Sequence, residues 1–71
     1  MVFIDCEKLE NDLMEYYQAV GEGKHFEILE IEIRHKIDHL NSLIDLAIDE
    51  KDHNLNFLIN ICYHYYRLLA G

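Results

Sequence analysis

Three side chains near the middle of the sequence have the types and spacing of metal ligands. Glu32, His35 and His39 recur at intervals of three and four residues, so a helix would present them within about 60° of one another. Glu-x-x-His is also the ligand spacing of di-iron helical bundles, but those sites draw on four helices. We therefore predict no bound metal and no other cofactor, and we place both histidines at an interface instead.

The aromatic run Tyr63-His64-Tyr65-Tyr66-Arg67 is a second distinctive segment. Tyrosine and arginine are enriched at protein interfaces because each combines apolar area with a polar tip. Neighbouring aromatic side chains cannot all face inward from one helix, so Tyr63 or Tyr66 should be exposed. Cys62 and His64 cannot form a nucleophile–base pair, because residues two apart on a helix point about 160° away from each other. The run predicts partner contact rather than catalysis.

No other motif in the sequence indicates a reaction. The chain has no phosphate-binding loop, and its sole serine, Ser42, lies in no nucleophile motif. A chain of 71 residues is also too short to enclose a cleft of paired carboxylates. We predict that the protein is not an enzyme.

The elements that must position these side chains are predicted to be helices. The chain has no proline, three glycines and many residues of high helix propensity. Breaks at Gly21-Glu22-Gly23 and at the polar segment 49–54 divide it into three helices over residues 5–20, 24–49 and 54–69. Asp5 is a plausible N-cap of the first helix, and either Asp52 or Asn54 can cap the third.

Short connections make successive helices antiparallel neighbours. We therefore predict one all-α domain over residues 1–71, either a small antiparallel three-helix bundle or a helical hairpin with an added N-terminal helix. In the first helix, the residues expected to face inward are Leu9, Leu13, Tyr16, Tyr17 and Val20. In the third helix they are Leu55, Leu58, Ile61, Cys62, Tyr65, Leu68 and Leu69.

The long central helix carries apolar residues on two faces. The face expected to enter the core follows a three-and-four spacing through Phe26, Leu29, Ile33, Ile37, Leu40, Ile44 and Ala47. A second stripe, more than about 100° round the helix, consists of Ile28, Ile31, His35, His39, Leu43 and Leu46. One short chain cannot cover both faces, so we predict a homodimer formed through the second stripe. Residues 26–33 alternate like a strand, but unbroken helical spacing to Ala47 favours a helix.

Acidic residues are concentrated in the N-terminal half of the chain. The net charge is −8, and residues 1–32 hold nine acids against two lysines. Such a field repels nucleic acid and attracts basic protein surfaces, so we expect no direct nucleic-acid binding. The residues predicted to bind a basic partner are Glu7, Glu10, Asp12, Glu15, Tyr63, Tyr66 and Arg67. Alternatively, the acidic face serves only to keep an apolar protein soluble.

The two cysteines, Cys6 and Cys62, are interpreted as free thiols in a reducing compartment, and a single disulfide between them is the alternative. No secretory leader is recognisable ahead of Cys6, and no apolar run reaches the roughly 20 residues of a membrane span. We expect a cytoplasmic protein that does not contact the membrane.

Residues 43–58 resemble a known family. The segment reads Leu-Ile-Asp-Leu-Ala-Ile-Asp-Glu-Lys-Asp from Leu43 and continues to Phe57 and Leu58. It is similar to the IDEAL domain, a short helical hairpin of Gram-positive bacteria and their phages that is named for its I-D-E-A-L core. The residues that match this core are Ile44, Asp45 and Ala47, and those that depart from it are Leu46 and Ile48. The resemblance implies a helical hairpin with no catalytic residues.

Together these features predict a non-enzymatic, acidic interaction protein. We expect a bacterial or phage regulator or inhibitor that binds a basic surface of a partner, such as a nucleic-acid-binding machine. A bacteriocin-immunity or antitoxin-type neutraliser has the same composition and differs only in its target. A small metal-binding helical bundle using His35 and His39 is the alternative from a different class.

Overall fold

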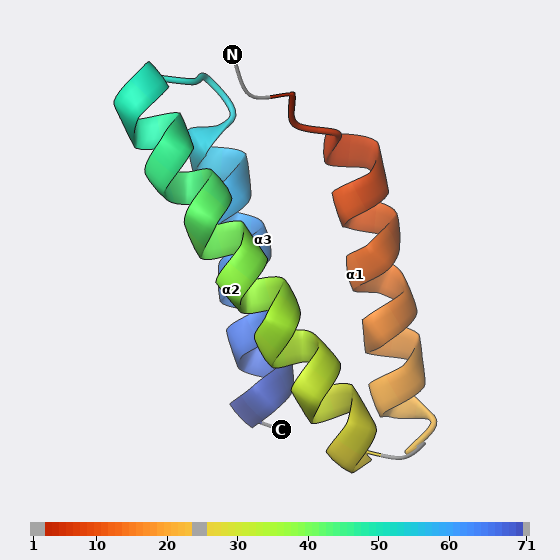
Figure 1. Ribbon diagram of the computed structural model, residues 1–71. Coiled ribbons are helices and arrows are strands. Elements are labelled where there is room, and N and C mark those ends of the chain that lie inside the picture. Colours follow the sequence, from red (N-terminus) through yellow and green to blue (C-terminus); the bar gives the residue numbers. More distant parts are fainter. Residues whose placement is uncertain (1–2, 24–25, 71) are drawn as a thin grey trace.

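The computed structural model describes residues 3–23 and 26–70, which form three helices (Figure 1). These are α1 (Cys6–Gly21), α2 (Phe26–Glu50) and α3 (Leu55–Ala70). No strand occurs in the described ranges, so the predicted all-α bundle is confirmed. Each helix ends one residue later than predicted, and the predicted start of the second helix at Lys24 lies outside the described residues.

The first helix is defined by the signals that the sequence carries at its two ends. Asp5 is the N-cap, and its Oδ1 accepts a hydrogen bond of 3.1 Å from the backbone N–H of Lys8. At the other end the backbone N–H of Gly23 donates to the carbonyl of Val20 at 3.0 Å, with Gly23 at a φ of 70°. Glycine adopts this left-handed conformation without a steric cost, which explains why the helix ends there.

The turn between α2 and α3 closes α2 with a Schellman motif. The N–H of Asp52 donates to the carbonyl of Ala47 at 2.9 Å, and the N–H of Lys51 donates to the carbonyl of Ile48 at 3.3 Å. Lys51 takes the left-handed conformation, with a φ of 54°. The Oδ1 of Asp52 accepts a hydrogen bond of 2.8 Å from the backbone N–H of Asn54. Of the two predicted capping residues, Asp52 is therefore the one whose side chain binds a backbone N–H just before α3.

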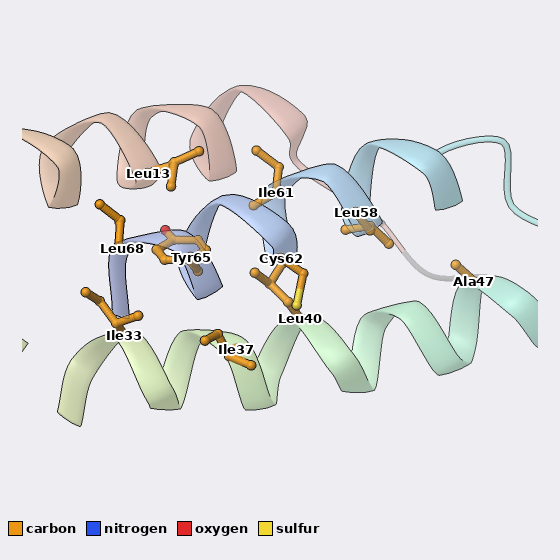
Figure 2. Packing of buried hydrophobic residues seen from close by; sticks show 10 residues of the cluster. All are labelled: Leu13, Ile33, Ile37, Leu40, Ala47, Leu58, Ile61, Cys62, Tyr65 and Leu68. Atoms are coloured by element: carbon orange, nitrogen blue, oxygen red, sulfur yellow. The ribbon is translucent and has the colours of Figure 1, made fainter. Parts of the chain in front are cut away.

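The core lies mainly between α2 and α3 (Figure 2). One buried residue comes from α1, four come from α2 and five from α3: Leu13; Ile33, Ile37, Leu40 and Ala47; Leu58, Ile61, Cys62, Tyr65 and Leu68. The α2–α3 interface is the most extensive, and α1 contacts α2 least. The fold is therefore a tight helical hairpin with α1 packed mainly on α3.

Two residues predicted to face the core are exposed instead. Phe26 is 42% exposed because the first turn of α2 extends beyond the end of α3, where Ile33 already lies beside Leu68 (Figure 2). Tyr17 is 39% exposed at the margin between α1 and α3. The edge of the core is formed by side chains that are only half-buried, among them Leu9, Tyr16, Val20, Leu29, Ile44, Leu55 and Leu69.

Candidate interaction surfaces

The acidic residues predicted on the first helix are not equivalent. Glu7, Glu10 and Glu15 are exposed on α1, as a contact surface requires. Asp12, by contrast, forms an ion pair of 3.0 Å with Lys36 of α2, and its side chain is only 22% exposed. The predicted partner contact of Asp12 stays a prediction, and its carboxylate also joins α1 to α2.

The pKa of Asp12 reflects this pairing. The hydrogen bond from Lys36 lowers the pKa of the Asp12 carboxyl below its usual value and outweighs the opposing effect of burial. The Nζ of Lys8 lies 3.4 Å from the same carboxylate and lowers the pKa further. Because α1 contacts α2 least of all helix pairs, this ionised group contributes directly to holding α1 in place.

A solvent-open groove of about 320 Å³ follows the boundary between α1 and α2. Its lining residues are Lys8, Asp12, Glu15, Tyr16, Ala19, Leu29, Glu32 and Lys36. Burial, and then the neighbouring carboxylate of Glu32, raise the pKa of Tyr16. With both lysines bonded to Asp12 and a phenol that stays protonated, the groove presents no activated nucleophile.

Tyr65 lies in the core beside this groove. Its ring packs edge-on against Tyr16 with centroids 5.7 Å apart, and its side chain is 0% exposed. The hydroxyl is buried and has no hydrogen-bond partner among the described residues. Burial raises the pKa of Tyr65 far above its usual value. The hydroxyl is thus a neutral group whose desolvation is not compensated.

The three residues with metal-ligand spacing do not gather into a metal site. Glu32, His35 and His39 line one shallow hollow together with Tyr16 and Lys36. Within residues 3–23 and 26–70, however, no three His, Cys, Asp or Glu side chains come close enough to hold a metal ion. The ammonium group of Lys36 in the same hollow would also oppose a cation.

The second stripe of the central helix is largely exposed in the single chain. Ile28 and Ile31 are each 59% exposed and Leu46 is 46% exposed, and both histidines of the stripe are also exposed. Leu43 is an exception because it is half-buried and packs against the core, so its assignment to this stripe is corrected. Helical spacing places a row of exposed carboxylates along one side of the stripe: Glu27, Asp38, Asp45 and Asp49. On its other side lie one exposed carboxylate, Glu32, and the half-buried Lys36.

The aromatic run on α3 divides between the core and the surface, as the sequence predicted. Tyr65 is fully buried, whereas Tyr63 and Tyr66 are 56% and 51% exposed. The guanidinium of Arg67 lies 5.9 Å from the centroid of the Tyr63 ring, within the range of a cation–π contact.

Sequence reasoning missed a contact that links this run to α1. The hydroxyl of Tyr17 and the Nδ1 of His64 share a hydrogen bond of 2.9 Å, and the two rings lie 6.1 Å apart between centroids. The rings of Tyr63 and His64 are 5.8 Å apart, so the contact continues along α3. The only feature of the sequence that hinted at this contact was the position of Tyr17 at the edge of the apolar stripe of the first helix.

Both cysteines are free in the structure. Burial raises the pKa of the Cys62 thiol, and its Sγ donates to the Oδ1 of Asn41 at 3.8 Å. Cys62 is therefore held protonated on the α2 side of α3, while His64 is bonded to α1. Cys6 is half-buried, and its Sγ donates to the Oδ1 of Asn54 at 3.7 Å. Among the described residues, the hydrogen-bond partner of each thiol is an amide oxygen, which does not deprotonate a thiol.

Comparison with known proteins gives no match: no family model, curated protein or solved structure is similar to this chain. The resemblance of residues 43–58 to the IDEAL domain therefore stays a prediction. Among the described residues, no helix combines the length and apolar character needed to cross a membrane.

Proposed function

We propose that this protein is an acidic, non-enzymatic regulator or inhibitor that binds a basic surface of a partner protein. The observation that carries the proposal is the exposed stripe of α2, in which Ile28, Ile31 and Leu46 lie beside a row of exposed carboxylates. Apolar anchors within a polar rim are the usual anatomy of a protein interface. The negative charge of this rim favours a partner that supplies lysine and arginine side chains.

The sequence predicted that this stripe joins two copies of the chain, and nothing yet tests that prediction. Its charged border supports a different occupant. Two copies that met there would bring carboxylates such as Asp38 and Asp45 close to those of a second, equally acidic stripe, and like charges side by side are costly. A basic surface would instead neutralise them.

The overall charge would assist such an encounter. The net charge of −8 includes Glu7, Glu10 and Glu15, which are exposed along α1. A field of one sign raises the rate at which an oppositely charged partner arrives. A protein that binds nucleic acid presents a basic surface to the phosphates, so this protein and nucleic acid would compete for such a surface.

The proposal is tested by affinity capture from an extract of the source cells, followed by cross-linking to locate the contact surface of the captured protein. Ile31→Asn should abolish capture because it removes a central anchor. Ile48→Asn is a matched control, because Ile48 is 54% exposed on the same helix but lies about 100° away from Ile31. Capture that survives Ile31→Asn, or a contact surface that proves acidic, would contradict the proposal.

A further inference from the structure

The outer face of α3 is a second exposed apolar surface. Ile59, Tyr63 and Tyr66 are 48%, 56% and 51% exposed, and their spacing of four and three residues places them in one row. The buried residues of α3, including Leu58 and Tyr65, lie on the opposite side of the helix. Exposed apolar residues that gather on one face of a helix commonly mark an interaction site.

The charge of this face differs from that of the rest of the molecule. All fourteen acidic residues of the chain lie between Asp5 and Asp52, so α3 contains none. The exposed polar side chains beside the row are amides and one cation: Asn56, Asn60 and Arg67. An otherwise strongly acidic protein thus has one helix whose outer face carries no negative charge.

We propose that this face binds a second copy of the chain, so that the protein forms a homodimer through α3. Two molecules of charge −8 repel each other over most of their surfaces, and α3 is the element along which they can approach with least repulsion. A basic partner, in contrast, would find no carboxylate here to pair with. The acid-free composition therefore favours self-association over the basic partner of the proposed function.

A twofold axis near Tyr63 would make this interface antiparallel and self-complementary. Ile59 of each copy would then lie near Tyr66 of the other, along helices of about 24 Å. The α2 stripes of both copies would stay free, so the dimer would present two surfaces for the partner. This arrangement differs from the dimer through α2 that the sequence predicted, and it does not depend on the proposed function.

Sedimentation equilibrium of the wild type and of three charge-introducing variants tests the proposal. The wild type should reach twice the 8.5 kDa chain mass. Ile59→Glu and Tyr66→Glu should each raise the dimer dissociation constant at least about tenfold, because each change enters the symmetric interface twice. Ile31→Glu, at a comparably exposed site on α2, should change it by less than about twofold. Circular dichroism checks that each variant remains folded.

Salt separates this interface from the one that binds the partner. Raising the salt concentration from about 50 to 500 mM should tighten the α3 dimer, because it screens repulsion between two acidic chains, whereas it should weaken binding to a basic partner. A wild type that is monomeric up to about millimolar concentration would overturn the proposal. So would a dimer disrupted by Ile31→Glu but not by Tyr66→Glu. If Tyr66→Glu affected only capture of a different protein, α3 would be a heterologous site and the proposal would again be wrong.

Discussion

Replacing Leu40 by alanine should remove most of the stability of this protein. Leu40 is 0% exposed, on the face of α2 that packs against α3 (Figure 2). Truncating a fully buried leucine forfeits its transfer free energy and leaves a cavity, at a total cost of about 2–5 kcal/mol. The core of a domain this small contributes only about 3–5 kcal/mol of net stability. At room temperature the variant should therefore be either only marginally stable or largely unfolded.

Leu46→Ala is the matched control for this prediction. Leu46 belongs to the same helix but is 46% exposed, so its truncation should change the free energy of unfolding by no more than about 0.5 kcal/mol. The difference in helix propensity between leucine and alanine is the same in both variants and cancels. Urea unfolding followed by far-ultraviolet circular dichroism measures both. A midpoint unmoved by Leu40→Ala but collapsed by Leu46→Ala would show that the two faces of α2 had been exchanged.

Three further predictions concern stability and ligands. Tyr65→Phe should raise the free energy of unfolding by about 1 kcal/mol, because it removes a buried hydroxyl that has no hydrogen-bond partner among the described residues. A lower free energy of unfolding, measured by urea unfolding, would show that this hydroxyl does have a hydrogen-bond partner. The lowered pKa of Asp12 means that its pair with Lys36 stabilises the fold above about pH 4 and is lost as pH falls through the folded-state pKa. Asp12→Asn should therefore flatten the acid limb of a pH–stability profile, and an unchanged limb would contradict this. Zinc at one equivalent should leave the melting temperature unchanged. A rise in melting temperature that disappears in a His35→Ala, His39→Ala double variant would contradict this prediction.

Local signals were sufficient to predict the helices and most of the core. Asp5 and Gly23 act through backbone groups within a few residues, so their effects can be predicted without knowing the fold. The apolar spacing of α2 likewise identified Ile33, Ile37 and Leu40 as buried. The helix ends depend on local capping and the core residues on periodicity along a single helix, both of which the sequence displays directly.

Sequence patterns did not reveal features that depend on a neighbouring helix. Phe26 continues the core stripe of α2, but whether it is buried depends on where α3 ends. The charge of Asp12 was evident, yet its partner Lys36 lies 24 residues away and meets it only because α1 and α2 are brought together. The bond between Tyr17 and His64 spans 47 residues for the same reason. Exposure of Tyr63 and Tyr66 was predictable because crowding within one helix determines it.

The proposed function requires that an acidic surface guides this protein to a basic partner. Its most direct test is the salt dependence of the association rate, measured by stopped-flow mixing with the purified partner. The rate should fall steeply between about 50 and 500 mM salt, because screening shortens the reach of the field to well under about 10 Å. Neutralising Glu7, Glu10 and Glu15 to glutamine should slow association at low salt and leave dissociation nearly unchanged. Rates that are indifferent to salt, and equal for the wild type and the neutralised variant, would contradict the claim.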